Sequence, residues 1–220
     1  MDDGLLFVLS EPGGRVPDSE FHHWYDLEHA PARLTVPGIN RGHRYRATDG
    51  IRPTWLALYP LCLNALDSPR YRALRTRTSY EQDIVDRLEI LDRRVYRQTS
   101  ATGHASERAP KHVLTVALSG RDIPALEAWY HEAHVPALGR LPGWQRTSCY
   151  QLLSGVAPRL LAVHELSGLV AHSADIYRRA LGGLCQLGPR LAVTEKELRL
   201  FTYHNTVQSG TRHQHRHQSH

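Results

Sequence analysis

The sequence is short of lysine, cysteine and long apolar runs, and each shortage excludes a class of protein. Only two of its 27 basic residues are lysines, and the arginines are scattered along the chain, which argues against the clustered basic surface of a nucleic-acid-binding protein. The three cysteines lie far apart with no C-x-x-C pair, so we expect neither a disulfide framework nor a sulfur-rich zinc site. No apolar run reaches the ~18–20 residues of a membrane helix. Because the acidic start also lacks the basic flank of a secretory signal, we expect a soluble, cytoplasmic protein.

Several catalytic signatures are also missing. The chain contains no G-x-S-x-G elbow, no Walker A loop and no G-x-G-x-x-G motif that opens a helix, so serine hydrolases, nucleoside-triphosphatases and Rossmann dehydrogenases lack support. His131 and His134 are three residues apart, but only His134 is expected to face inward, and no metal site is predicted. The remaining composition, with 41% hydrophobic and 22% charged residues among 220, is that of an ordinary globular protein.

The most informative feature is an internal repeat. At an offset of 105 residues, positions 24–45 align with positions 129–150, and nine of the 22 residues are identical. Chance would give about one or two identities, so the repeat indicates a duplicated unit rather than a solenoid. The same offset aligns positions 53–61 with 158–166 without a gap.

Each copy predicts the same order of elements: strand, helix, two strands, helix and strand. The predicted strands are 5–9, 39–47, 54–61 and 90–99 in the first copy, and 113–118, 144–152, 159–166 and 197–207 in the second. A Pro-Gly turn precedes the second strand of each copy, and the second helices are predicted at 71–77, with a continuation over 81–88, and at 174–181. The order βαββαβ is that of a ferredoxin-like unit. We therefore predict an α+β fold with repeats at 1–102 and 111–207, a linker at 103–110 and a disordered, histidine-rich tail at 208–220.

The first helix of each copy has a histidine on its apolar stripe. In the first copy the stripe also includes a glutamate, Glu28, next to His29, whereas the second copy has Ala133 next to His134. A proline two residues after each histidine is expected to kink the helix and free nearby carbonyl groups. Two interpretations are open: the histidines support the kink by bonding those carbonyls, or the kink presents them to a cavity.

The repeated pattern Trp-Tyr-x-x-x-His-x-Pro, followed by Pro-Gly and Arg-x-x-x-Tyr, resembles the EthD-like members of the dimeric α/β barrel superfamily, here as a tandem fusion. This resemblance implies an intrachain pseudo-dimeric α/β barrel with helices outside and a mostly apolar pocket between sheet and helices. Similar proteins include cofactor-free decarboxylases and cyclases, muconolactone isomerase, quinone-forming monooxygenases and more distant haem enzymes. We expect no cofactor, a small aromatic or polyketide-like substrate, no nucleic-acid or membrane partner, and a pseudo-dimer within one chain that could form a further homodimer.

The candidate site residues follow from the repeat and from this resemblance. A desolvated glutamate and histidine can serve as acid and base, so His29 and Glu28 are the predicted catalytic pair and His134 is the counterpart in the second copy. The predicted substrate-binding residues are Trp24, Tyr25, Arg41, His43, Tyr45, Trp129, Tyr130, Tyr150 and His164. Alternatively, Glu28 pairs with an arginine such as Arg41, and the aromatic residues only pack the core.

Three functions remain open at this point. The first is a cofactor-independent lyase or isomerase, of the decarboxylase or cyclase type, that uses general acid–base catalysis. The second is a cofactor-free monooxygenase that acts on a phenolic or anthrone-like substrate. The third is a protein that binds a hydrophobic ligand without catalysis.

Overall fold

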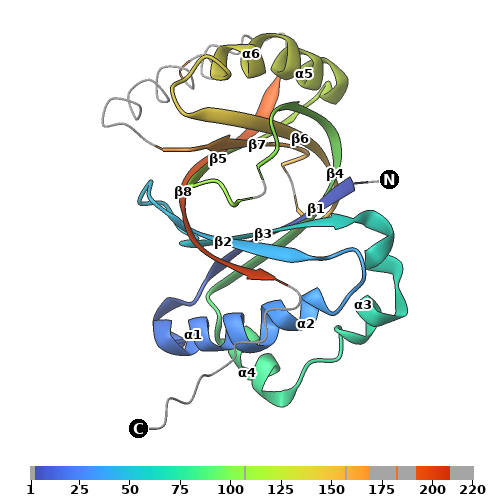
Figure 1. The fold of residues 1–220 in the computed structure, drawn as a ribbon, viewed down its shortest axis with the longest axis vertical. Coiled ribbons are helices and arrows are strands. Elements are labelled where there is room, and N and C mark those ends of the chain that lie inside the picture. The colour runs from blue at the N-terminus through green and yellow to red at the C-terminus, as the bar shows by residue number, and fades with distance from the viewer. Residues whose placement is uncertain (1–2, 107, 157, 169–181, 183–191, 209–220) are drawn as a thin grey trace, which may run out of the picture.

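Eight strands form a closed antiparallel barrel in the order β1-β3-β2-β8-β5-β7-β6-β4 (Figure 1). The computed structural model describes residues 3–106, 108–156, 158–168, 182 and 192–208. The strands are β1 (Asp3–Glu11), β2 (Arg41–Ala47), β3 (Trp55–Cys62), β4 (Ile90–Gly103), β5 (His112–Gly120), β6 (Trp144–Ser154), β7 (Leu160–Leu166) and β8 (Val193–Gln208). The predicted strands are confirmed, although β4 continues to the first residue of the expected linker.

Helices cover the outside of the barrel on two opposite sides (Figure 1). On one side lie η1 (Gly13–Arg15), α1 (Asp18–Trp24), η2 (Tyr25–His29), α2 (Ala30–Leu34), η3 (Leu63–Asp67), α3 (Pro69–Ala73) and α4 (Ser79–Arg87), and on the other lie α5 (Ile123–Trp129), η4 (Tyr130–His134) and α6 (Val135–Leu138). The predicted continuous helix over 71–88 is two helices, because Thr78 accepts a hydrogen bond from the Glu81 amide and caps a new start. The helix predicted at 174–181 lies outside the described residues. No described helix is long and apolar enough to cross a membrane.

The barrel consists of two sets of four strands with the same order. The first half (residues 3–103) has the order β4-β1-β3-β2, and the second half (residues 112–208) has the order β8-β5-β7-β6. Two seams join the halves: β2 pairs with β8, and β4 pairs with β6. Each seam has a register shift at an equivalent position. The shift is next to the pair Arg44–Asn205 in the β2–β8 seam and next to the pair Cys149–Ser100 in the β4–β6 seam. Positions 105 residues apart are therefore equivalent at the seams as well as in the repeat.

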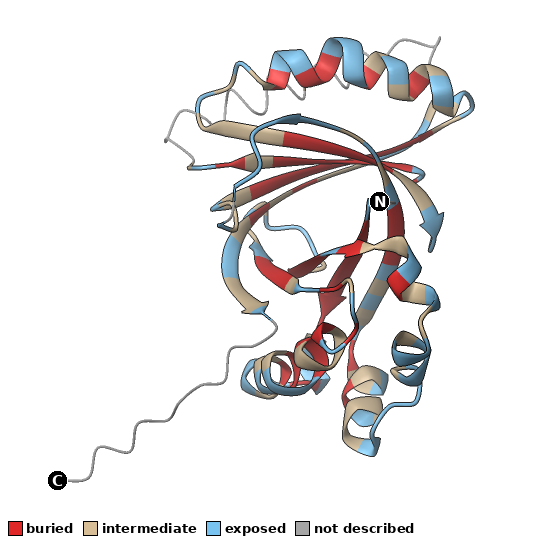
Figure 2. Cartoon of the chain, turned by 45° about the vertical axis from the view of Figure 1, so that its right-hand side comes forward, coloured by how far each residue is buried: buried red, intermediate tan, exposed pale blue. Residues whose placement is uncertain are grey.

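Apolar side chains pack on both faces of the barrel wall, as Figure 2 shows by the buried residues along the strands. One cluster fills the barrel interior. Two others lie between the wall and the helices, one in each half. Because both faces of β1 are covered, all its residues from Gly4 to Glu11 are buried, which explains its continuous apolar run.

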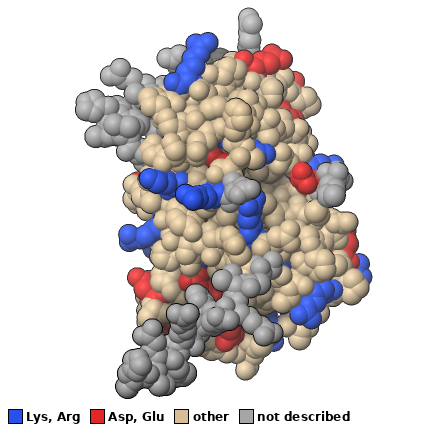
Figure 3. Space-filling model, in the orientation of Figure 1, with Lys and Arg blue, Asp and Glu red and all other residues tan. Residues whose placement is uncertain are grey.

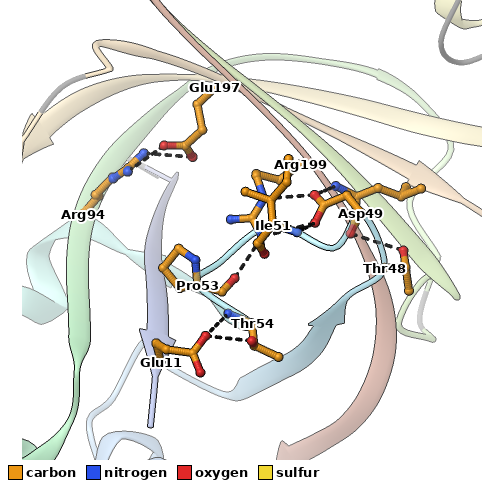
Figure 4. Close-up of polar contacts among 10 residues, drawn as sticks. Glu11, Thr48, Asp49, Ile51, Pro53, Thr54, Arg94, Glu197 and Arg199 are labelled. Atoms are coloured by element: carbon orange, nitrogen blue, oxygen red, sulfur yellow. Dashed lines mark hydrogen bonds and ion pairs between the residues drawn. The ribbon is translucent and has the colours of Figure 1, made fainter. Parts of the chain in front are cut away.

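One end of the barrel is closed by two buried arginines at equivalent positions (Figure 4). Arg94 bonds Glu197 at 2.9 Å, and Arg199 bonds Asp49 at 2.9 Å and also donates to the Pro53 carbonyl. Only 4% of Arg94 and 3% of Arg199 are exposed to solvent. A buried guanidinium needs such partners, because an unpaired one would cost several kcal/mol. Both buried guanidinium groups at this end of the barrel interior are therefore paired with carboxylates.

Candidate active site

The first helix of each half contains one π-helical turn just before its proline. In the first half the Ala30 amide bonds the Tyr25 carbonyl, and in the second half the Val135 amide bonds the Tyr130 carbonyl. Each bond spans five residues instead of four, so the turn accommodates one extra residue and shifts the buried face by one position. The distortion expected at the two prolines is therefore a widened turn.

This shift places Glu28 on the outside, so its predicted role in a buried acid–base pair is wrong. Glu28 is exposed, whereas His29 is buried and Ala30 replaces Glu28 on the inner face. The equivalent Ala133 is exposed in the same way. A regular helical stripe assumes 3.6 residues per turn, and that assumption fails across a π-helical turn.

His29 forms a hydrogen bond with a carboxylate on another helix. Its Nδ1 atom lies 2.8 Å from Oε1 of Glu81 in α4, and its ring packs on Trp24 and Tyr25. Burial and the nearby Arg33 lower the pKa of His29 to about 4, although Glu81 opposes this shift. The hydrogen bond to His29 also lowers the pKa of Glu81. Neutral His29 thus donates to ionised Glu81 and ties the two helices of the first half together.

A cavity of about 220 Å³ lies between the helix of the second half and the barrel wall. Its floor is apolar and is formed by Val116, Leu118, Cys149, Leu160 and Ala162. Its polar lining comes from the helix, with Glu127, Tyr130, His131 and Glu132, and from the β4–β6 seam, with Thr99, Ser100 and Tyr150. Burial raises the pKa of the Cys149 thiol to about 11, so this side chain is part of the apolar wall.

The equivalent place in the first half is filled by larger side chains. At equivalent positions, the first half has Arg44, Trp55 and His204 where the second half has Cys149, Leu160 and Thr99. The guanidinium of Arg44 bonds Asp26 at 2.6 Å and His22 at 3.1 Å, and it lies 4.1 Å from the centre of the Tyr25 ring. Among the described residues, the second half has smaller side chains at these positions, and its cavity lies there.

A buried chain of hydrogen bonds runs from the cavity into the second half. The Tyr130 hydroxyl lies 2.6 Å from Nε2 of His164, whose Nδ1 lies 2.7 Å from Oγ1 of Thr147. The indole of Trp144 donates to the same Thr147 oxygen at 3.0 Å. Burial lowers the pKa of His164 to about 3, so its ring is neutral, and burial raises the pKa of Tyr130 well above its usual value.

The two tautomers of His164 give this chain two states. With the proton on Nδ1, His164 accepts from Tyr130. With the proton on Nε2, His164 donates to Tyr130, and the Tyr130 hydroxyl is then free to donate into the cavity. The chain can therefore offer a ligand oxygen a hydrogen bond without placing a charge in the site.

The other predicted residues divide between the two faces of the barrel wall. Trp24, Tyr25, Trp129 and His134 lie on the helix side with His29, Tyr130 and His164. His134 stacks on Trp129, and its Nε2 atom has no hydrogen-bond partner among the described residues. Burial lowers the pKa of His134 to about 4.

The remaining predicted binding residues point into the barrel, away from the helices. Arg41, His43 and Tyr45 share one face, as their alternation in β2 predicts, and Tyr150 occupies the place equivalent to Tyr45. Nδ1 of His43 lies 2.9 Å from the Thr206 hydroxyl. Tyr150 also lines the cavity under the helix, whereas Arg41, His43 and Tyr45 do not line it.

Sequence reasoning predicted two residues of the cavity, Tyr130 and Tyr150, and missed the others. His131 is exposed, as expected, and also lines the cavity together with Glu127, one turn earlier on the same helix. Gln151 donates a hydrogen bond of 2.6 Å to Glu127 and holds its carboxylate. The signal lay in the repeat, where Arg44 aligns with the much smaller Cys149.

Known proteins give a likeness in fold. No protein-family model and no curated protein matches the chain. Among solved structures, an anthrone oxidase-like protein matches with a TM-score of 0.69 and 10% identity, over 95% of this chain and 94% of that one. A protein from Lactobacillus acidophilus NCFM, provisionally named a monooxygenase, matches with a TM-score of 0.53 and 9% identity, over 96% and 98%.

A further match, from Fusobacterium nucleatum and also provisionally named a monooxygenase, has a TM-score of 0.56 and 9% identity, over 95% of each chain. At these identities the likeness shows a shared architecture. The chain has a mixed α+β fold, with a closed antiparallel barrel and helices outside it.

Proposed function

We propose that the chain is a tandem fusion of two ferredoxin-like units, as in the EthD-like proteins that its repeated motif resembles. The identical strand order of the halves, the two equivalent seams and the two π-helical turns support this proposal. In this arrangement the second half provides the substrate-binding cavity, and larger side chains fill the equivalent place in the first half.

We further propose that the protein is an enzyme, a cofactor-independent monooxygenase that acts on a small phenolic substrate. The observation that carries this proposal is the cavity, in which an apolar floor meets Tyr130, Glu127 and His131. Its volume of about 220 Å³ suits a ligand of one or two aromatic rings, since ~150 Å³ is enough for benzene. The names of the structural neighbours favour an oxygenase over the lyase or isomerase of our first expectation.

The side chains have separate roles in this reaction. His131, which lines the cavity with Glu127, accepts the phenolic proton, and the Tyr130 hydroxyl stabilises the resulting phenolate. The electron-rich ring carbon para to the oxygen passes an electron pair to O₂ and forms a hydroperoxide. Loss of water then gives the quinone, so one phenol and one O₂ become one quinone and one water.

One observation also supports a lyase or isomerase. The Tyr130 hydroxyl can donate a proton to a substrate carbon, and His164 can return a proton to Tyr130 through the hydrogen bonds that continue to Thr147. Such a proton return is the step that a decarboxylase or isomerase needs, and it requires no oxygen. The two functions therefore differ in oxygen uptake.

The test uses 1-naphthol, a phenol of two rings, as the probe, with an oxygen electrode and quinone absorbance recorded together. We expect one O₂ consumed for each quinone formed, and a loss of turnover of ~10²–10⁴-fold in His131→Ala. His23→Ala removes an exposed histidine from the helix of the first half and is the matched control. Leu160→Trp restores the first half's residue and should close the cavity. Turnover without O₂ uptake would favour the lyase or isomerase, and binding without turnover would favour a ligand carrier.

A further inference from the structure

A second, larger cavity of about 670 Å³ lies inside the barrel. Arg41, His43 and Tyr45 of β2 line it, together with Arg146 and Tyr150 of β6. It lies at the end opposite the paired arginines, because Arg41 begins β2, whereas Asp49, just after the end of β2, bonds Arg199. Figure 1 shows the segment between β4 and β5 crossing in front of the barrel, and residues of this segment line the cavity mouth.

Two arginines at equivalent positions, Arg41 and Arg146, line this cavity. Neither donates a hydrogen bond to a residue in the described ranges, and the buried Nε atom of Arg146 is without a partner there. At the other end of the same barrel, Arg94 and Arg199 are each bonded to a carboxylate. Since the fold supplies anions where its interior arginines are structural, the pair without a bonded carboxylate among the described residues indicates an anion that comes from outside.

One acid, Glu165, lies directly opposite Arg146 in the β6–β7 pairing and interacts electrostatically with both arginines. Glu165 lines the cavity, but no ion pair within the described residues joins it to Arg41 or Arg146. Burial raises the pKa of Glu165, and the two arginines only partly oppose this. Asp3 and Arg108 also line the cavity and balance each other in charge. Basic side chains accordingly gather across the middle of the face seen in Figure 3.

The rest of the cavity is apolar or aromatic. Leu5, Leu58, Val113 and Val163 line it, and the rings of Tyr45 and Tyr150 belong to the same interior cluster. A free inorganic anion would leave these walls in contact with water. The lining therefore fits a molecule with one anionic end and an apolar body.

We propose that the barrel interior binds one small organic carboxylate per chain, with its carboxylate held by Arg41 and Arg146 and its apolar body against the leucine and valine walls. A carboxylate suits this place because the planar guanidinium group forms paired hydrogen bonds with it. This site and the cavity under the helix lie on opposite faces of the barrel wall, and of their lining residues they share Tyr150. The proposal does not depend on the proposed oxygenase activity.

The test is isothermal titration of the full chain with 2-naphthoate and with 2-naphthamide, which has nearly the same shape but no charge. We expect one naphthoate per chain, with naphthamide binding ~10–100-fold more weakly, as the loss of a charge-assisted pair predicts. Arg146→Gln should weaken naphthoate binding by a similar factor and leave naphthamide unchanged. Leu160→Trp, which fills only the cavity under the helix, should leave naphthoate binding intact.

Three results would overturn the proposal: equal affinity for both probes, unchanged naphthoate affinity in a folded Arg146→Gln protein, or loss of binding in Leu160→Trp. The last result would assign the ligand to the cavity under the helix. If Arg146→Gln does not fold, Arg41→Gln provides the same test at the equivalent position. The comparison of the two probes on the unaltered protein needs no variant, and a failure here leaves the O₂ assay of the proposed function unaffected.

Discussion

Removing one hydroxyl group from each half tests the role of Tyr130 against its own equivalent. Tyr130→Phe breaks the 2.6 Å contact with His164, and Tyr25→Phe breaks the 3.1 Å hydrogen bond that the Tyr59 hydroxyl donates to Tyr25. His164 and Tyr59 are each 1% exposed, so both variants leave a buried polar atom without its partner. Such an atom costs ~1–3 kcal/mol. Both variants should therefore lose similar stability.

Their effects on catalysis should differ. Tyr130 lines the cavity, and the loss of a hydrogen-bond donor to a developing oxyanion lowers turnover by ~10²–10³-fold. The Tyr25 hydroxyl lies in the packed first half, beneath the Arg44 guanidinium, so Tyr25→Phe should keep the turnover of the folded protein. The matched loss of stability separates a catalytic role from a folding role.

The assays are urea unfolding and kcat for O₂ uptake, measured on the same samples. A loss of ~1–3 kcal/mol corresponds to a fall in Tm of ~2–12 °C for a chain of this size. If both variants lose activity only in proportion to unfolded protein, Tyr130 is a structural residue. Equal losses of kcat in two folded variants would instead show that the first half also works.

Two further predictions concern stability. Burial, with Arg41 nearby, lowers the pKa of His43 to about 4. Between about pH 6.5 and pH 4 the unfolded chain binds more protons than the folded one. The free energy of unfolding should therefore fall as pH falls through this range. His43→Asn, which can still bond Thr206, should reduce this pH dependence by up to ~1.4 kcal/mol per pH unit. Urea midpoints of the unaltered protein that stay the same at pH 7, 5.5 and 4 would contradict the lowered pKa of His43. The fragment of residues 1–102 should aggregate or dimerise in sedimentation experiments, because β2 and β4 lose their partners and the interior leucines become exposed; a stable soluble monomer would contradict this.

The repeat and the strands could be predicted because they depend on local signals. The Pro-Gly turns place Gly38 and Gly143 at φ of +93° and +81°, a conformation that glycine adopts freely. The apolar runs of β1 and β5 are typical of strands that are covered on both faces. These features need no knowledge of distant contacts.

The site could not be predicted in the same way, because packing between distant segments creates it. The cavity lies at the seam between β4 and β6, where Ser100 pairs with Cys149. Residues near 100 were expected to lead into a linker, so no local pattern connected them to the helix of the second half. The alternation in β2 correctly placed Arg41, His43 and Tyr45 on one face. It could not say which face, because both faces of the wall are apolar.

The difference between the two seams depends on the duplication itself. In a symmetric homodimer both seams would have the same residues, so an arginine at position 44 would fill both and a cysteine would open both. In this chain the β2–β8 seam keeps Arg44, sandwiched between Asp26 and the Tyr25 ring, whereas the β4–β6 seam has Cys149 and a cavity. A buried ion pair contributes little net stability, but the aromatic packing around Arg44 buries apolar area without a void. A fused chain can therefore keep one seam fully packed and leave the other open for a ligand, which a homodimer of either half could not do.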